Sequence, residues 1–569
     1  MSEYSRAVAV SFTNPATARR QTPRGVWYAS GLGADDMGRL ETATDPAAAG
    51  DIVVGRVRDA SVVYVELDGG APVRVKAWKG LLGVHEVFYA RLPDGRWYLT
   101  DHFHNVMAVL PEGQRAMTDE TLLRHYVSAA VYGRETYARG ADRVANGDRL
   151  DIDLVAGEAT VQIFSRHTAM STDEPMEIHL GRLDAALEDV VGSLRTVPGL
   201  GVGFSGGVDS TLLLTYLGTH GIPLTVVPGS PEFDAETEYA RSAAHLLRRD
   251  IVEIQLDEAD YLHNLEHSIE SLGMPLESYI VPVLARLYEH DSPLFVIGEG
   301  ADSVFGSGRG IRRLASLLSG RAGLEVLRRL EGDGRLGRRA RQIGEYAARF
   351  AEPPSSPRGY AGTALNYYGD MSGTVRMYGE EAIAALDRTM LQEVFDRVEL
   401  ETAEGDRFAR HIEIAQWRVI FSDLALAGNH DAHAIGKRQV NPYLSWRVVS
   451  EHLKVPARAR YYKGFTGKWM LKELLIRRVD GYPVNKRKLA TSLPFERYLA
   501  RGPLTGIWDR YDIPEAVPAE LWPEVRTKAT PLTWKAITHA IWQDRVVANP
   551  NLEPHPAAVA DSWSFPGAG

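Results

Sequence analysis

Cysteine is missing from this sequence of 569 residues. Its absence excludes disulfides, zinc sites built on thiolates and cysteine nucleophiles. No apolar run approaches the roughly 18 residues of a membrane-spanning helix, and no basic, apolar signal opens the chain, so we expect a cytoplasmic protein. The net charge of −10 argues against general affinity for nucleic acid. The length predicts several domains.

The segment from Gly201 to Thr211 places a glycine-rich turn between an apolar strand and an apolar helix. Residues 200–204 predict the strand, Ser205-Gly206-Gly207 the turn and residues 210–217 the helix. Backbone N–H groups and the positive dipole end at the start of that helix suit a bound phosphate. Asp209 lies at the mouth of the turn, where its carboxylate would repel phosphate unless a divalent cation lay between them. We therefore expect Asp209 to bind Mg²⁺.

Short alternating strands separated by turns dominate the first part of the chain. We expect strands at residues 51–58, 61–67, 73–78, 86–92 and 96–100, one helix at 119–132, and a closing hairpin at 151–164. Mostly antiparallel strands with little helix predict a β-rich sandwich domain over residues 1–170.

From residue 171 the pattern changes to strands that alternate with helices, followed by a mainly helical region beyond Arg312. We expect strands at 200–204, 224–227, 251–255 and 294–297, with helices near 210–220, 236–247, 258–272 and 278–289. This alternation predicts a parallel sheet whose ligands bind beyond the carboxyl ends of the strands. The loops at Ser205, Pro228-Gly-Ser-Pro231 and Gly298-Glu-Gly-Ala-Asp302 then converge on one crevice.

The stretch Ser205-Gly-Gly-Val-Asp-Ser210 matches the SGGxDS signature of the PP-loop ATP pyrophosphatases, which cleave ATP between its α and β phosphates. With Pro228-Gly-Ser-Pro231 and Ile297-Gly-Glu-Gly-Ala-Asp-Ser303, the chain resembles the asparagine synthetase-like family over nearly its whole length. The resemblance implies an α/β protein with an N-terminal Ntn-hydrolase-type β-sandwich over residues 1–170. It further implies a synthetase domain over 171–569, in which a PP-loop core at 198–310 with a parallel five-stranded sheet precedes a helical extension.

The same resemblance implies that the protein uses ATP and Mg²⁺. Asp302 would join Asp209 in holding Mg²⁺ on the pyrophosphate; the alternative for Asp302 is a cap on the helix that follows. Lys468, in a segment similar to the lysine-bearing helix that follows the family's Pro-Tyr-Leu motif, here Pro442-Tyr-Leu444, would contact the pyrophosphate. The other expected nucleotide contacts are Phe204, Ser205, Gly206, Gly207, Ser210, Thr225, Val226, Ile297 and Gly298.

Two further residues are implied for the acyl-transfer step. Lys488, in a stretch that resembles the family's Arg-Pro-Lys element with Arg487 in place of proline, would stabilise developing charge. Glu299 would orient or deprotonate the incoming amine, which must be neutral to attack, or would only cap its loop. β-Lactam synthetases carry tyrosine at that position, so Glu299 argues against that branch.

Glutamine-dependent members of the family need a cysteine directly after the initiator methionine, and this chain has Ser2 there. We therefore expect the N-terminal domain to be a degenerate glutaminase. Three glutamine-independent branches fit: lasso-peptide macrolactam cyclases, β-lactam synthetases and intermolecular amide ligases. We favour macrolactam closure of a leader-free precursor peptide, with a leader peptidase as a partner and a homodimer as a further expectation, because an arginine-rich stretch at 309–341 offers a place to hold a peptide.

Other features carry less weight. That arginine-rich stretch is more simply a solvated face of surface helices. His102 with His104, and His430 with His433, lack a third ligand and are expected to be loop or core histidines. The tail from 553 to 569 is rich in proline and alanine, and we expect it to be partly disordered. A catalytically dead binding scaffold and a tRNA-modifying PP-loop enzyme remain as alternatives of other classes.

Overall fold

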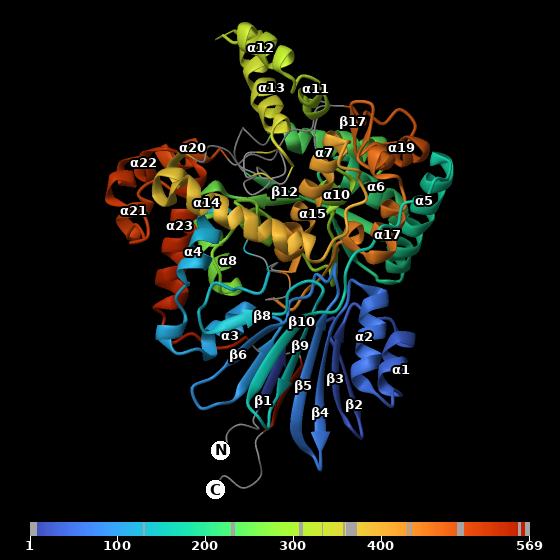
Figure 1. The fold of residues 1–569 in the computed structure, drawn as a ribbon, viewed down its shortest axis with the longest axis vertical. Helices are drawn as coiled ribbons and strands as arrows, with labels where there is room; N and C mark the ends of the chain where they lie inside the picture. The colour runs from blue at the N-terminus through green and yellow to red at the C-terminus, as the bar shows by residue number, and fades with distance from the viewer. Residues whose placement is uncertain are drawn as a thin grey trace.

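The computed structural model describes residues 8–128, 131, 133–228, 234–306, 311–332, 334–354, 356, 359, 372–428, 432, 435–485, 494–555 and 559–563. A two-sheet part that begins with the N-terminal strands lies below a larger part built around a third sheet (Figure 1). None of the described helices is long and apolar enough to cross a membrane.

The N-terminal part is a sandwich of two sheets. One sheet has the order β18-β1-β7-β6-β8 and the other the order β10-β9-β5-β4-β3-β2. The strands are β1 (Val8–Phe12), β2 (Ala18–Thr22), β3 (Gly25–Ser30), β4 (Ser61–Asp68), β5 (Ala71–Lys79), β6 (Phe88–Arg91), β7 (Trp97–Thr100), β8 (Ala141–Arg143), β9 (Asp148–Asp153), β10 (Glu158–Ile163) and β18 (Val559–Trp563). Val8, Tyr28, Val63 and Leu99 from the two sheets form a shared core, so the predicted β-sandwich is confirmed.

Helices cover the outer faces of both sheets. Helices α1 (Ala34–Glu41) and α2 (Pro46–Val57) pack on the β2–β5 side, and α3 (Phe103–Val109) packs on β6 and β7. The strand predicted at 51–58 is therefore wrong. Asp45 caps α2 by accepting bonds from the N–H groups of Ala47 and Ala48, and Pro46 fits the first helical turn. These start signals outweigh the strand preference of the β-branched residues that follow.

One other expectation for this part needs correction. The helix predicted at 119–132 is α4 (Asp119–Val127), which starts where expected and ends earlier. The tail contributes an ordered strand, because β18 pairs antiparallel with β1 from Val8 opposite Trp563 to Phe12 opposite Val559. The last described strand of the chain therefore belongs to the sandwich that the first strand begins.

The second part contains a five-stranded parallel sheet with the order β13-β12-β11-β14-β15. Its strands are β11 (Leu200–Gly203), β12 (Gly221–Pro228), β13 (Val252–Leu256), β14 (Leu294–Val296) and β15 (Arg438–Val440). The predicted fold class, an α/β protein with a sandwich and a parallel five-stranded sheet, is confirmed. The glycine-rich turn follows β11, the central strand, which places it at the middle of the carboxyl edge.

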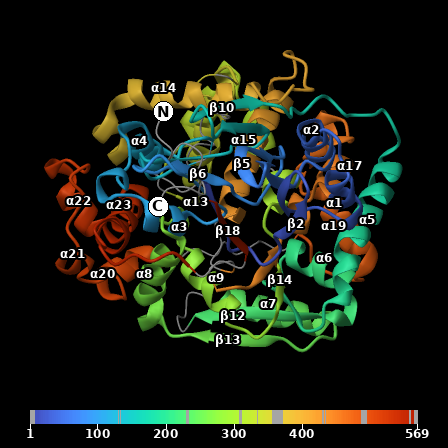
Figure 2. The same cartoon turned by 90° about the horizontal axis from the view of Figure 1, so that it is seen from below.

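Helices cover both faces of this sheet. They are α5 (Met176–Gly192), α6 (Val208–Leu217), α7 (Asp234–Leu246), α8 (Tyr261–Leu272), α9 (Val281–Tyr288) and α10 (Ala301–Phe305). Apolar residues of α5, α6 and α7 share one core with Leu200 and Val202 of β11, and Figure 2 shows α5 and α6 side by side. On the opposite face Leu287 of α9 packs with Leu224 and Phe295 of the sheet.

The rest of the described chain is mainly helical, as expected. It comprises α11 (Ile311–Leu317), α12 (Arg321–Leu330), α13 (Arg335–Ala351), α14 (Ser372–Phe395), α15 (Arg407–Gly428), a 3₁₀ turn η8 (Pro442–Leu444), α17 (Trp446–Leu453), α18 (Ala457–Arg460), a short hairpin β16 (Tyr462–Lys463) and β17 (Thr466–Gly467), α19 (Trp469–Arg478), α20 (Phe495–Arg501), α21 (Ile507–Arg510), α22 (Trp522–Thr527) and α23 (Pro531–Trp542).

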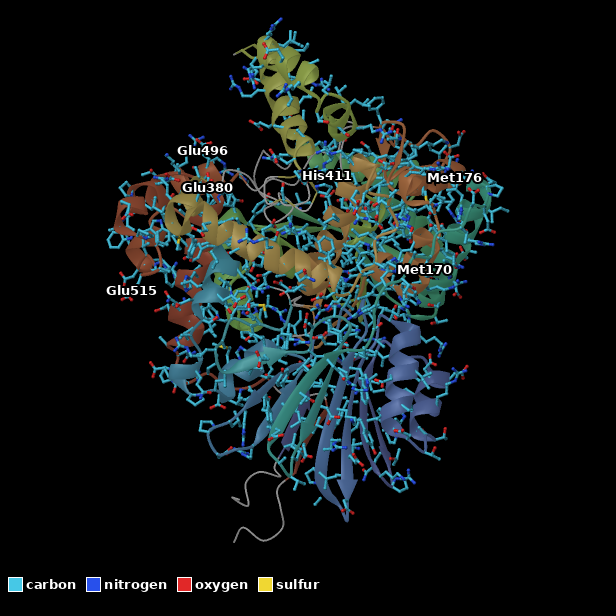
Figure 3. All side chains as sticks on the ribbon, in the orientation of Figure 1. Met170, Met176, Glu380, His411, Glu496 and Glu515 are labelled. Carbon is cyan, nitrogen blue, oxygen red and sulfur yellow. The ribbon has the colours of Figure 1, made fainter. Side chains whose placement is uncertain are left out.

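Helices α11, α12 and α13 form a lobe that projects from the molecule (Figure 1). The lobe joins the body through a core that contains Ile412 of α15 together with Tyr461 and Tyr462. Figure 3 places His411 near the base of the lobe, where its ring nitrogens contact the carbonyls of Arg407 and Glu352 at 2.6 and 3.0 Å. The side chains of Arg328 and Arg329 are 74% and 77% exposed, as a solvated arginine face requires.

Candidate active site

The turn between β11 and α6 has a backbone that only glycine allows. Gly206 has φ of +67°, and a Cβ added there would lie 2.8 Å from the Tyr239 carbonyl oxygen. The N–H of Gly207 donates to Ser205 Oγ (3.3 Å), and the N–H of Ser205 donates to Ser210 Oγ (3.2 Å). The N-cap residue of α6 is Gly207, which has no side chain that could cap the helix. The first N–H groups of α6 thus have the arrangement that binds phosphate at helix starts.

Three charged side chains from distant parts of the chain meet beside this turn. The ammonium nitrogen of Lys468 lies 2.7 Å from Asp209 Oδ2 and 2.6 Å from Asp302 Oδ1. Asp209 comes from the start of α6, Asp302 from the first turn of α10, and Lys468 from the residue before α19. The structure therefore brings together the two carboxylates and the lysine that the sequence singled out. Gly300, rather than Asp302, is the N-cap residue of α10.

The donor set of this cluster fits Mg²⁺. Asp209 Oδ1 is buried and has no hydrogen-bond partner among the described residues. An unpaired buried carboxylate oxygen is costly, and carboxylate oxygens are the protein ligands that Mg²⁺ prefers. Gly298 lies next to Asp209, since a Cβ added there would be in ordinary van der Waals contact with Asp209 Cβ at 3.4 Å.

Lys468 adopts a backbone conformation that is unusual for its residue type. Its φ of 52° and ψ of 30° lie in the left-handed region, which typically costs a non-glycine residue about 1–3 kcal/mol. The β16–β17 hairpin before it and α19 after it fix this geometry, and the side chain is only 10% exposed. Strain of this kind is typical of residues held for function.

Lys472 belongs to the same cluster, and the sequence analysis missed it. It lies one helical turn beyond Lys468 on α19, and burial, followed by the charge of Lys468, lowers the pKa of its ammonium group. The charge of Asp209 acts in the opposite direction. The spacing of four residues from Lys468 is the signal that could have identified it, because such residues share a helix face.

Substituting Lys472 with methionine is expected to weaken binding of Mg²⁺·ATP about tenfold, the effect of losing one charge-assisted contact to phosphate. The matched control is Lys463→Met, because Lys463 is an exposed lysine of the adjoining hairpin. Titration calorimetry with a non-hydrolysable ATP analogue measures both affinities. Equal affinities for Lys472→Met and the unchanged protein would remove Lys472 from the site.

Two buried tyrosines hold the backbone of the turn. Tyr443 Oη donates to the carbonyl of Asp209 at 2.8 Å, and Tyr482 Oη donates to the carbonyl of Gly206. Tyr482 Oη also lies 3.1 Å from Thr211 Oγ1. Burial raises the pKa of both phenols, so they remain neutral donors. The sequence marked the motif around Tyr443 but indicated neither contact.

The residues expected to contact adenine divide into two groups. Val226 and Ile297 share an apolar cluster on the α9 side of the sheet, and Thr225 is the neighbouring residue of β12. Phe204 instead packs in the core with its side chain 2% exposed, so it supports the turn from behind. Glu299 is half-buried between Gly298 and Gly300 at the same edge.

Some expected residues lie outside the described part of the chain. They are Lys488 with Lys486 and Arg487, the loop residues Gly229 to Pro231, and His430 and His433. His102 and His104 are buried, as expected of core histidines, and the ring of His104 stacks on that of His555 at 4.1 Å. Among the described residues, no group of three or more His, Asp or Glu side chains forms a metal site.

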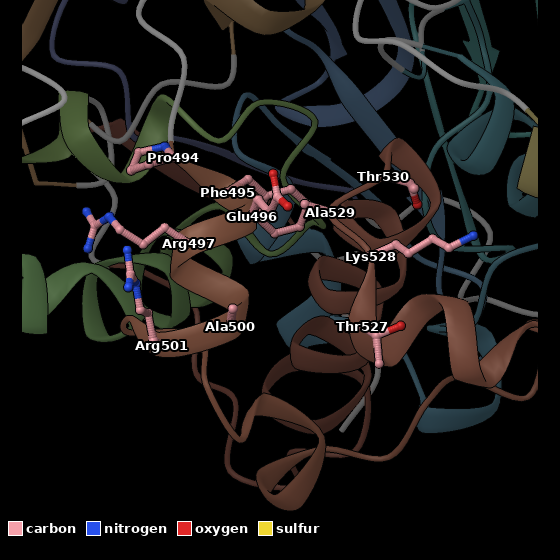
Figure 4. Close-up of a pocket in the computed structure, with 10 residues that line it drawn as sticks. All are labelled: Pro494, Phe495, Glu496, Arg497, Ala500, Arg501, Thr527, Lys528, Ala529 and Thr530. Carbon is pink, nitrogen blue, oxygen red and sulfur yellow. The ribbon is translucent and has the colours of Figure 1, made fainter.

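An open pocket of about 900 Å³ lies between α20 and the loop before α23 (Figure 4). Its lining includes Phe495, Arg497, Arg501, Lys528 and Thr530. Arg497 pairs with Glu258 at 2.5 Å, which offsets part of the positive charge. The pocket begins at Pro494, directly after residues 486–493, and shares no residue with the carboxylate–lysine cluster.

Comparison with known proteins gives one family. The asparagine synthase family model matches residues 182–526, which is more than half of the chain and includes Asp209, Asp302 and Lys468. A search of the curated proteins finds no match. The match supports ATP-dependent amide synthesis as the general activity and a ligase as the enzyme class. On this match, the chain belongs to the asparagine synthase family.

Proposed function

We propose that the protein adenylates a carboxylate with ATP, releasing pyrophosphate, and lets an amine displace AMP to form an amide without hydrolysing glutamine. One observation carries the proposal: Lys468 bridges Asp209 and Asp302 beside the phosphate-binding turn at the carboxyl edge of the parallel sheet. The cluster therefore supplies both the acidic and the basic groups that binding of a magnesium polyphosphate needs.

In the first step a carboxylate oxygen of the substrate attacks the α phosphorus of ATP, and the bond to the bridging oxygen breaks. Asp209 and Asp302 hold the cation, while Lys468 binds the leaving pyrophosphate. When bound, Mg²⁺ neutralises charge on the phosphates. Glycine at 206 and 207 allows the backbone N–H groups to approach the phosphates closely.

In the second step the amine nitrogen attacks the acyl carbon and forms the C–N bond. The bond between the acyl carbon and the phosphate oxygen breaks, AMP leaves with that electron pair, and the nitrogen loses one proton. We assign proton acceptance to Glu299, the carboxylate of the loop between β14 and α10. We assign stabilisation of the oxyanion to Lys488. Besides Lys468, Lys472 adds a second positive charge close to Asp209.

The N-terminal sandwich, which we assign to residues 1–170 and to which β18 adds one strand, has no cysteine with which to attack a glutamine amide. We propose that it is a degenerate glutaminase and that residues 171–569 make the amide. The amine must then come from a second substrate or from the same molecule as the acid.

The substrate that we favour is a leader-free precursor peptide closed into a macrolactam ring. The arginine-rich lobe of α11 to α13 supports this choice. Arg328 and Arg329 are exposed and share a single acidic partner among the described residues, Glu325, so the pair keeps a net positive charge that suits an acidic peptide. A small-molecule acid joined to a separate amine is the alternative; Glu299 argues against a β-lactam product.

The test is incubation of the protein with ATP, Mg²⁺ and a candidate peptide encoded beside its gene. We expect intact mass spectrometry to show loss of about one water, the mass balance of amide closure, with one AMP formed per ring. The same peptide with its Asp and Glu side chains, which provide the carboxylate to be activated, changed to Asn and Gln serves as the control. AMP without a ring would show that the acceptor amine is wrong, and absence of AMP with every peptide would exclude the peptide substrate.

A further inference from the structure

A turn of the N-terminal sandwich contacts the segment that leads into α17. Asp59 Oδ2 accepts hydrogen bonds from the N–H of Trp446 (2.8 Å) and from Ser445 Oγ (3.2 Å). The guanidinium of Arg58 lies 4.6 Å above the centre of the Trp446 ring. Two neighbouring residues of the sandwich thus contact the first residues of a helix in the synthetase part.

Contacts within the sandwich hold the backbone of the turn at Arg58 and Asp59 in place. Arg58 has φ of 61° at the end of α2, and its N–H donates to the carbonyl of Val54 at 2.9 Å. Its own carbonyl accepts from the N–H of Leu82 at 2.7 Å. A Cβ added at Gly80 would lie 2.3 Å from that carbonyl oxygen, so the backbone is held on both sides.

Next to Ser445, the 3₁₀ turn η8 contacts both segments that carry the site carboxylates, Asp209 and Asp302. Ser445 follows η8 directly, and Tyr443 of η8 donates its hydroxyl proton to the carbonyl of Asp209. Leu444 fills the space over Gly300, where an added Cβ would lie 2.4 Å from Leu444 Cγ. Gly300 caps α10, which carries Asp302.

We propose that Asp59 is a positioning residue for the nucleotide site. By holding residues 445 and 446, it fixes η8 and thereby the backbone at Asp209 and the start of α10. On the proposed function the sandwich supplies no ammonia. Through Asp59 it instead keeps the nucleotide site in place for the synthetase reaction. The inference rests on that proposed function, because it takes the Asp209–Asp302 cluster as the site for magnesium and ATP.

The test measures the affinity for Mg²⁺·α,β-methylene-ATP by calorimetry in the full-length protein. We expect Asp59→Ala to weaken it about tenfold, the usual effect of losing a charge-assisted hydrogen bond. Asp59→Asn keeps an acceptor oxygen and is expected to restore most of that affinity. Ser445→Ala removes one of the two bonds without touching the sandwich and is expected to give a smaller loss.

The matched control is Asp101→Ala. Asp101 is also an acidic residue of the sandwich that accepts two backbone bonds, from Thr13 (2.8 Å) and Asn14 (2.9 Å), and both donors lie inside the sandwich. We expect this variant to lower the midpoint of thermal unfolding and to keep the nucleotide affinity.

The outcomes separate the two proposals. If the unchanged protein fails to bind the analogue, the proposed ATP site is wrong. If the unchanged protein binds and both Asp59→Ala and Ser445→Ala bind equally well, the positioning role is wrong. If Asp101→Ala weakens binding as much as Asp59→Ala does, general loosening of the sandwich explains the effect and overturns the specific contact. If Asp59→Ala does not fold, the affinities of Asp59→Asn and Ser445→Ala still decide whether Asp59 positions the nucleotide site.

Discussion

Substituting Asp209 with alanine is expected to abolish measurable AMP formation. The substitution removes one of the two carboxylates that hold the cation, and a catalytic metal contributes several kcal/mol, which corresponds to a loss of about a thousandfold. The fold is expected to persist, because Oδ1 has no hydrogen-bond partner among the described residues and Oδ2 bonds to Lys468 alone among them. Quantified AMP and the midpoint of thermal unfolding provide the two readouts.

The matched control for this variant is Asp184→Ala. Asp184, like Asp209, pairs with a basic side chain, in this case Arg478 at 2.7 Å, but it lies on the α5 side of the sheet, where it also accepts a hydrogen bond from Tyr216 at 2.6 Å. We expect it to retain full AMP formation. Activity retained by Asp209→Ala would show that the metal assignment is wrong.

Substituting Lys468 with methionine is expected to reduce AMP formation by roughly a hundredfold or more, since the charge of a preorganised, mostly buried group is lost while its length is kept. A second effect has the opposite sign. The ammonium group lies within 2.7 Å of both carboxylates, so without it Asp209 and Asp302 repel each other. The variant is therefore expected to bind free Mg²⁺ more tightly than the unchanged protein does.

Lys437→Met controls for loss of a partly buried lysine near the same sheet. Lys437 donates to the carbonyls of His290 and Ser292 at 3.2 and 3.3 Å, away from the carboxylates. We expect a lower unfolding midpoint with unchanged AMP formation. If Lys468→Met forms AMP at the normal rate, the lysine only neutralises the carboxylates in the protein without ligand.

The turn and the sheet were predictable because their signals are local. Gly206 has a positive φ that few other residues adopt, and strict alternation of strands with helices fixes parallel order. Convergence of Asp209 and Asp302 then follows from topology, because the carboxyl ends of parallel strands meet at one edge. Lys468 came from family resemblance, since a lysine before a helix gives no signal of its own.

The features that could not be predicted from the sequence depend on contacts between distant residues or on local signals that compete. The bonds from Tyr443 and Tyr482 to the turn join segments more than 200 residues apart. At α2, the capping residue Asp45 and the following proline prevailed over a run of β-branched side chains. Pairing of β18 with β1 joins the two ends of the described chain, which no local pattern encodes.

That pairing bears on how the chain folds during synthesis. β1 lies between β7 and β18, so one of its edges stays unpaired until the last described strand has been made. An exposed strand edge is a template for wrong pairing with another chain. Most of the sandwich is therefore made before the synthetase part, but β1 gains its second neighbour only after that part, and the new chain has to keep the open edge from other molecules in the meantime.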